Sequence, residues 1–136
     1  MRLSAYIRVL GDEGTIRRIN EEAKAADSAM RPLKARTGVG DEVWWQWSTK
    51  RTAIDVDRAD EGLRTVLSSH RSIFPTIRKY KGPRIDIYLE VVSEYRENER
   101  PKALHLSAET ISLLSELGGA LDNDSVPLVG DPSLWE

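Results

Sequence analysis

The sequence predicts an α+β fold of two layers, a mainly antiparallel sheet with all of its helices on one face. Two observations support this prediction. Strand-like and helix-like patterns alternate along the chain, and the strand-like segments are apolar on one side only. A doubly wound sheet, with helices on both faces, would require strands that are apolar on both sides. The length of 136 residues favours a single domain, residues 1–136, with residues 127–136 as a C-terminal tail.

The first part of the chain predicts a strand followed by a helix. Residues 3–10 alternate between apolar and polar side chains, which is typical of a half-buried strand. After a glycine-containing break, Asp12 or Thr15 is placed to cap a helix over about residues 14–28, where apolar side chains recur at helical spacing. The proline and glycines of residues 31–42 predict a loop.

Tryptophan dominates the second predicted strand. Residues 43–48, with the sequence VWWQWS, are rich in strand-forming side chains. Alternation puts Trp45 and Trp47 on the core side of this strand and Trp44 with Gln46 on the other side. Trp44 is therefore the tryptophan that we expect to contact a partner.

The middle of the chain predicts a helix and then the clearest strand. Apolar residues recur at helical spacing from Asp57 or Asp60 to Ile77, and Pro75 is expected to bend or divide this helix. After a Gly-Pro turn, residues 85–92 alternate between apolar and polar side chains.

The last part of the chain predicts a connection, two short strands and a capped helix. The charged residues 94–102 are expected to form a solvated hairpin loop that leads to a short strand over residues 103–106. Ser107 then caps a helix that Gly118 ends in a left-handed conformation, and a strand fits residues 120–126. The order strand, helix, strand, helix, strand, strand, helix, strand favours a ferredoxin-like arrangement.

Composition excludes several classes of protein. The chain contains no cysteine, which excludes disulfide scaffolds and thiolate sites and fits a cytoplasmic location. No apolar run approaches the roughly 18 residues that a membrane span needs. The net charge of −2 disfavours a nucleic-acid partner.

Charge is distributed unevenly along the chain. Residues 64–84 carry basic side chains and no acidic one, whereas residues 107–136 carry acidic side chains and no basic one. The two blocks can neutralise each other within the fold, lie on a solvated surface, or attract a charged partner. All three interpretations stay open at this point.

The side of the sheet that the helices leave uncovered is the candidate binding face. Alternation assigns to it an unusual mixture of aromatic and charged side chains, namely Tyr6, Arg8, Trp44, Gln46, Asp86, Tyr88, Glu90, His105, Asp122 and Asp124. Such mixtures are typical of protein interfaces. The alternative is a solvated surface with cross-strand ion pairs, such as Arg8 with Asp86 or Glu90.

Sequence motifs for catalysis are weak. His70 and His105 lack the spacing of a metal motif, and Ser107 beside His105 occupies the position of a helix cap. We therefore predict no catalytic residue, no metal and no cofactor. The alternative is a small enzyme or ligand-binding module that uses the acidic residues of the open face together with His105.

Three segments resemble the bacterial domain of unknown function 4279 family: LSAYIRVLGDE, VWWQWS and above all LHLSAETISLLSELGGALDND. The resemblance covers residues 3–126 and implies a small cytoplasmic protein of a group suspected of acting as immunity proteins beside toxins. It implies no active site. We therefore expect a non-catalytic, immunity-type protein that inhibits a toxin domain by occlusion; a homodimer is left open.

Overall fold

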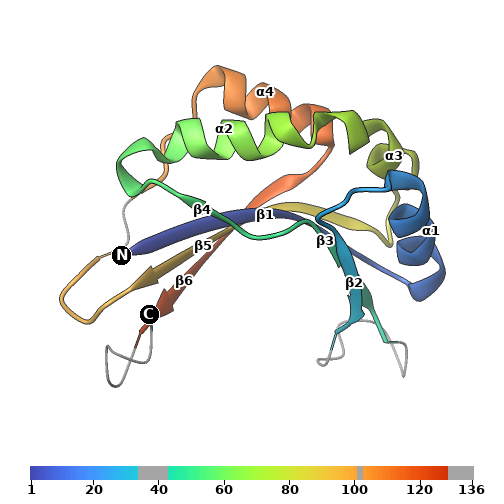
Figure 1. Ribbon diagram of the computed structural model, residues 1–136, viewed down its shortest axis with the longest axis horizontal. Coiled ribbons are helices and arrows are strands. Elements are labelled where there is room, and N and C mark those ends of the chain that lie inside the picture. The colour runs from blue at the N-terminus through green and yellow to red at the C-terminus, as the bar shows by residue number, and fades with distance from the viewer. Residues whose placement is uncertain (34–42, 101–102, 129–136) are drawn as a thin grey trace.

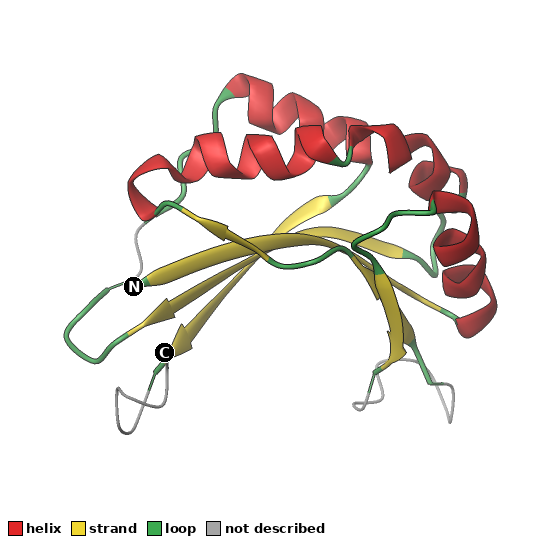
Figure 2. Ribbon diagram, in the orientation of Figure 1, coloured by secondary structure: helices red, strands yellow, loops and turns green. Residues whose placement is uncertain are grey.

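The computed structural model describes residues 1–33, 43–100 and 103–128, which form two layers. One layer is a sheet and the other consists of helices, and Figure 1 shows all the labelled helices on the same side of the sheet. Figure 2 shows the sheet arching beneath the helix layer, so that the uncovered face lies on the inside of the arch. The predicted two-layer α+β fold with helices on one face is confirmed.

The sheet is built around its first strand. The strands are β1 (Arg2–Gly11), β2 (Ala29–Pro32), β3 (Trp45–Ser48), β4 (Thr52–Ile54), β5 (Asp86–Tyr95) and β6 (Ala120–Pro127). Their order is β2-β3-β1-β5-β6, with β4 also paired to β1. All pairs are antiparallel except β5 with β6. The elements from β1 to β5 follow the ferredoxin-like β-α-β-β-α-β pattern with two changes: β4 is inserted after β3, and the second helix is divided into α2 and α3. Helix α4 then adds β6 by a parallel crossover.

The first and the last helix begin at the caps that the sequence predicts, and the last helix also ends at its predicted glycine. The helices are α1 (Glu13–Ala23), α2 (Ala59–Ser69), α3 (Phe74–Lys79) and α4 (Ala108–Leu117), with short 3₁₀ turns η1 (Val56–Arg58) and η2 (Arg71–Ile73). Asp12 and Ser107 each accept a backbone hydrogen bond as caps of α1 and α4. Gly118 ends α4 with φ +77°. Pro75 lies in the first turn of α3, so the predicted long helix is divided.

The core lies between the two layers. It joins the inward side chains of β1 and β5 to the apolar stripes of the helices, and its largest fully buried members are Trp47 and Phe74. Trp45 is partly buried and packs against this core. The prediction that Trp45 and Trp47 belong to the core is confirmed.

One helix boundary and two strands differ from the sequence prediction. Helix α1 ends at Ala23 instead of residue 28, because Lys24 takes a left-handed φ of 49°. Strand β2 follows and pairs with β3, and β4 pairs with the first half of β1. Both missed strands are short segments at the margin of the sheet, where local alternation is a weak signal. Most of the predicted loop over residues 31–42 lies outside the described residues.

The predicted strand over residues 103–106 is wrong. This segment has no strand partner and leads into α4. Leu104 and Leu106 pack against the core while His105 is exposed. One-sided burial of an extended segment produces the same alternation as a strand, which explains the error.

Candidate functional site

Strand register places most of the predicted residues on the uncovered face. Tyr6 pairs with Glu90, and Arg8 pairs with Tyr88, across β1 and β5. The residues between them, such as Ile7 and Leu89, are fully buried against the helices. Since paired residues share a face of a sheet, the uncovered face also includes Gln46, Asp86, Asp122 and Asp124. Trp44 precedes β3 and is half-buried.

His105 does not belong to this face. It lies in the segment that leads to α4 and is exposed. The other histidine, His70, contacts Asp27 with its Nε2 atom at 3.0 Å, on the helix side. Ser107 uses its Oγ atom to accept the backbone N–H of Thr110. The expected cluster of acidic residues with His105 is therefore smaller than predicted: among the described residues it contains Glu90, Asp122 and Asp124, and neither Asp86 nor His105 belongs to it.

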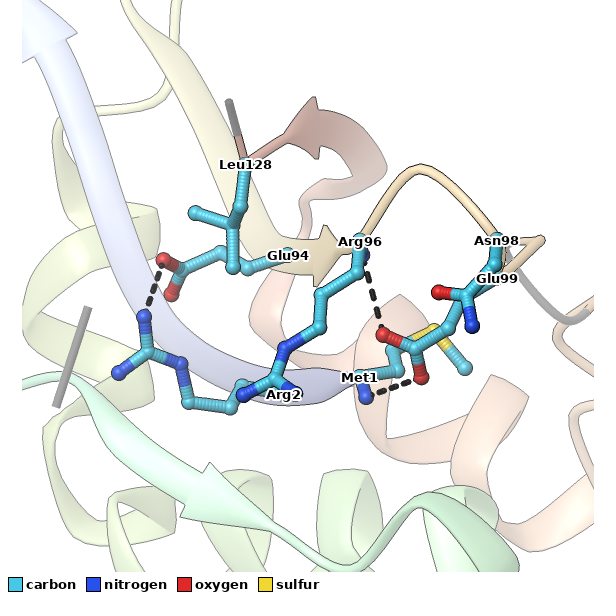
Figure 3. A pocket seen from close by; sticks show the side chains of 7 residues that line it. All are labelled: Met1, Arg2, Glu94, Arg96, Asn98, Glu99 and Leu128. Carbon is cyan, nitrogen blue, oxygen red and sulfur yellow. Dashed lines mark hydrogen bonds and ion pairs between the residues drawn. The ribbon is translucent and has the colours of Figure 1, made fainter. Parts of the chain in front are cut away.

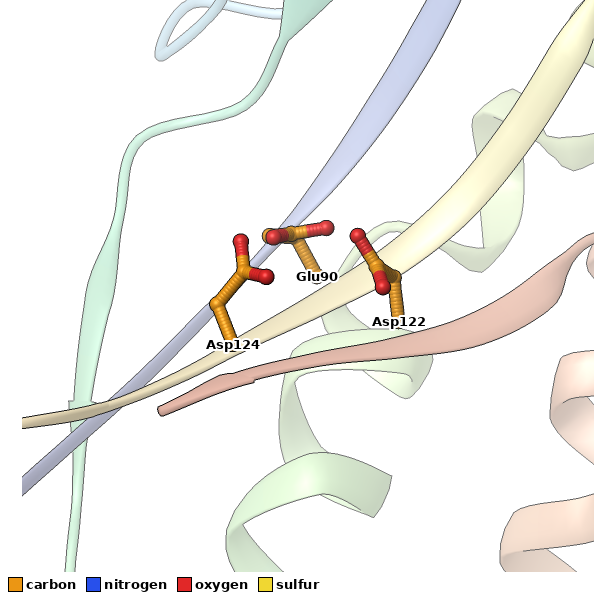
Figure 4. Close-up of side chains that lie close together, drawn as sticks. All are labelled: Glu90, Asp122 and Asp124. Carbon is orange, nitrogen blue, oxygen red and sulfur yellow. The ribbon is translucent and has the colours of Figure 1, made fainter. Parts of the chain in front are cut away.

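Three carboxyl groups converge where β5 meets β6. Glu90 pairs in register with Asp122, and Asp124 lies two residues further along β6, which returns its side chain to the same face. One carboxylate oxygen from each residue lies within 4.8 Å of the others. Figure 4 shows the three side chains pointing toward one another on one side of the sheet.

Glu90 is the buried member of this cluster. Its exposed fraction is 0%, and neither carboxylate oxygen has a hydrogen-bond partner, whereas Asp122 is half-buried and Asp124 is exposed. Burial, together with the neighbouring Asp124 and Asp122, raises the pKa of Glu90 to about 9. At neutral pH, Glu90 is therefore protonated unless a cation takes the place of that proton.

The electrostatic free energy of the cluster is high when all three carboxyl groups are ionised. Two like charges about 4 Å apart repel by about 1 kcal/mol in water and by about 4 kcal/mol at the effective dielectric constant of a protein surface. A carboxylate that is buried without a hydrogen-bond donor also loses its hydration. Among the described residues, Glu90 is the one with two buried side-chain oxygens that lack a hydrogen-bond partner.

Two arginines at this face stack on tyrosines. The Arg8 guanidinium lies 5.7 Å from the centre of the Tyr88 ring, and the Arg51 guanidinium lies 5.5 Å from the centre of the Tyr6 ring. Among the described residues, Arg8 forms no ion pair with Asp86 or Glu90, so the ion pairs considered from the sequence are not formed. Arg8 still lowers the pKa of Glu90, but less than burial raises it.

Further polar atoms of this face are buried without a partner. They include Ser4 Oγ, Arg8 Nε, Trp44 Nε1 and Gln46 Oε1. Buried polar groups are normally hydrogen-bonded, so these atoms are exceptions, as is Trp47 Nε1 on the core side of the sheet. The sequence gives no signal for this property, because it depends on how neighbouring side chains cover each atom.

The two charge blocks face each other in the helix layer. Arg71 pairs with Glu116 at 2.9 Å, and Arg64 approaches Glu109 at 3.7 Å, which joins the region of α2 and α3 to α4. Internal neutralisation therefore accounts for part of both blocks. Asp122 and Asp124 belong to the same acidic block but lie on the opposite face of the sheet.

A pocket of about 540 Å³ lies at the end of the sheet where β1 begins, and Figure 3 shows its lining. The charged groups in it pair with one another. Arg2 contacts Glu94 at 3.2 Å, and the Met1 amino group contacts Glu99, which also accepts the backbone N–H of Arg96. Hydrogen bonds from the Met1 amino group and the Arg96 backbone lower the pKa of Glu99, which makes this carboxylate a weaker base, so the pocket is a weaker candidate than the uncovered sheet face.

Comparison with protein families identifies one match. The model of the family described as "Domain of unknown function (DUF4279)" matches residues 31–126, more than half of the chain. The chain belongs to the DUF4279 family. The match ends at the expected residue but begins later than the resemblance at Leu3 suggested. A comparison of the DUF4279 chain with curated proteins finds no match. Within its described residues, no helix has the length and apolar character needed to cross a membrane.

Proposed function

We propose that this chain is a non-catalytic protein-binding module, an immunity-type protein that occludes a basic toxin domain with its uncovered sheet face. The observation that carries the proposal is the composition of that face. It combines Tyr6 and Tyr88, each stacked on an arginine, with carboxylates that have no ion-pair partner among the described residues. Aromatic and arginine side chains dominate the buried centres of protein interfaces.

Charge complementarity supports a basic partner. Asp86 is exposed at one end of the face, and Asp122 and Asp124 line its β6 side. The basic side chains of α2 and α3 lie on the other layer, where Arg64 and Arg71 contact acidic residues of the chain. Such separation of charge attracts a basic surface to the sheet face and increases the association rate more than the affinity. We also propose that the protein acts in the cytoplasm.

The product of the adjacent gene is the candidate partner with which binding is tested. Co-purification followed by calorimetry is expected to show a one-to-one complex, and the complex is expected to suppress the activity of the toxin in proportion to its amount. Replacing Tyr88→Ala or Trp44→Ala should weaken binding by more than about 1 kcal/mol each, because each removes an aromatic contact. Absence of a complex at micromolar concentration contradicts the proposal.

A matched control lies on the other layer. Ile111 is 53% exposed on α4, so Ile111→Ala removes an apolar side chain that the uncovered face does not contain. Its affinity should equal that of the unmodified protein. If Ile111→Ala and Tyr88→Ala weaken binding of the partner equally, the interface does not lie on the uncovered sheet face. Sedimentation of the isolated chain distinguishes self-association through the same face from binding of a different protein.

The alternative function is a small enzyme or ligand-binding module that uses the acidic cluster. The convergence of Glu90, Asp122 and Asp124 favours ligand binding over catalysis, because His105 lies outside the cluster and cannot act there as a base.

A further inference from the structure

We propose that Glu90, Asp122 and Asp124 form a binding site for one hard divalent cation of the size of Ca²⁺. The inference goes beyond the proposed function and does not depend on it. It rests on two observations: the convergence of three carboxylate oxygens within 4.8 Å, and a wholly buried Glu90 whose two oxygens point into the cluster without a hydrogen-bond partner.

The geometry fits the size of such an ion. Calcium–oxygen bonds of about 2.3–2.6 Å place three oxygens that surround one ion about 4.0–4.5 Å apart. The oxygens of Glu90, Asp122 and Asp124 lie within 4.8 Å of one another, so small side-chain rotations bring them to these separations. They come from two adjacent, paired strands, β5 and β6, so the sheet restricts the separation of the ligands. A site on paired strands orders its ligands more precisely than one on a loop.

The chemistry of the ligands selects the class of ion. All three are carboxylates, which favour Ca²⁺, Mg²⁺ and Mn²⁺ over ions that prefer nitrogen or sulfur ligands. His105 and His70 lie outside the cluster, so the described part of the chain supplies no imidazole to it. Three protein ligands leave coordination positions for water, and an affinity in the range of about 10⁻⁵ to 10⁻³ M is expected.

The site has a route to solvent. Asp124 is exposed and Asp122 is half-buried, whereas Glu90 forms the floor. An ion can therefore bind from the inside of the arch without opening the core. The positive charge of Arg8 does not compete for the site directly, because its guanidinium stacks on Tyr88.

Titration of the chelator-treated full chain with CaCl₂ at constant ionic strength tests the proposal. Calorimetry should give one ion per chain, and the melting temperature should rise with CaCl₂ but not with added KCl. Terbium provides a second readout, since Tyr88 lies on the same face of β5, two residues from Glu90, and can sensitise terbium luminescence. Parallel titrations with MgCl₂ and MnCl₂ rank the ions.

Variants distinguish binding of Ca²⁺ at a defined site from non-specific attraction of cations to an acidic surface. Asp124→Asn removes an exposed ligand, so folding should be preserved while the dissociation constant for Ca²⁺ rises at least tenfold; Glu90→Gln should have a similar effect. Asp86→Asn is the matched control, because Asp86 lies on the same face of β5 outside the cluster, and it should bind Ca²⁺ like the unmodified protein.

Two results would overturn the proposal. One is no saturable binding of Ca²⁺, Mg²⁺ or Mn²⁺ at millimolar concentration, which would mean that a proton alone relieves the repulsion at Glu90. The other is equal weakening in Asp86→Asn and Asp124→Asn, which would mean that cations only accumulate near an acidic surface.

Discussion

The side chain of Asp60 accepts a hydrogen bond of 2.8 Å from the backbone N–H of Ser107, 47 residues later in the chain. Asp60 lies in the first turn of α2, and Ser107 is the N-cap of α4. Arg64 joins the same group, since its Nη1 atom lies 3.2 Å from Asp60 Oδ2. One carboxylate therefore fixes the beginning of α4 against the beginning of α2.

Replacing Asp60→Ala should lower the free energy of unfolding by about 1–2 kcal/mol at pH 7, because it leaves the N–H of Ser107 without its acceptor. That N–H lowers the pKa of Asp60 below its usual value. The stabilisation is thus present above the unfolded pKa near 3.8 and lost as the pH falls through the lower folded value. Urea unfolding between pH 2.5 and pH 7 measures both effects. Glu61→Ala, an exposed neighbour in the same turn, should change little.

For Glu90 we predict the opposite effect of pH on the free energy of unfolding of the chelator-treated protein. Its folded pKa of about 9 lies above the unfolded value of 4.5, so the folded state holds a proton that the unfolded state releases. The free energy of unfolding should therefore fall as the pH rises from about 5 toward 9, by at most about 1.4 kcal/mol per pH unit. The groups that face Glu90 are Asp122 and Asp124 from β6, Tyr88 from β5, and Arg8 and Tyr6 from β1.

The Glu90→Gln variant provides the comparison, because its amide does not titrate. Its free energy of unfolding should be nearly independent of pH over this range and should exceed that of the unmodified protein at pH 9. Parallel slopes for the two proteins would show that Glu90 ionises normally.

Gly118→Ala should destabilise the protein by about 1 kcal/mol. An added Cβ would meet its nearest neighbours, Arg78 and Lys81, only at 3.5 Å, so the cost comes from the left-handed φ of +77° and not from a clash. Gly82→Ala is the control. No positive φ constrains it and its nearest atom is 4.0 Å away, so it should be neutral or slightly stabilising. Thermal unfolding of the two variants measures the difference.

Asp12→Ala should cost about 0.5–2 kcal/mol, because Asp12 accepts both the backbone N–H and the hydroxyl of Thr15 at the start of α1. The neighbouring Glu13→Ala removes the exposed ion pair with Arg17 and should lower the free energy of unfolding by about 0.3–0.5 kcal/mol. Chemical denaturation is the measurement. A larger loss in Glu13→Ala than in Asp12→Ala would contradict the capping role.

The sequence predicts those parts of the fold whose signals are local. Asp12, Ser107 and Gly118 mark the ends of helices because caps act within one turn, and Pro75 divides a helix because it lacks an N–H. Alternation along β1 and β5 was sufficient to assign the uncovered face, since those strands are long.

The remaining features depend on distant residues. Strands β2 and β4 are short and are defined by pairing with β3 and β1, which no local pattern reveals. Of the candidate site, alternation assigned Glu90, Asp122 and Asp124 to one face and so allowed an acidic cluster there. It could not separate Asp86 and His105 from that cluster, because their positions depend on the register of β5 with β6 and on the path of residues 103–106. The misplacement of His105 follows from the incorrect strand over residues 103–106. Binding by the assigned residues stays a prediction.

Strand β1 has neighbours on both sides, and all of them occur later in the chain. Its longest partner, β5, begins only at Asp86. During synthesis, an amphipathic segment therefore leaves the ribosome well before the strand that will cover its hydrogen-bonding edge. Pairings between such distant segments slow folding to milliseconds or seconds, and the open edge favours aggregation meanwhile. We expect the yield of correctly folded chain to depend on temperature and chaperones during expression.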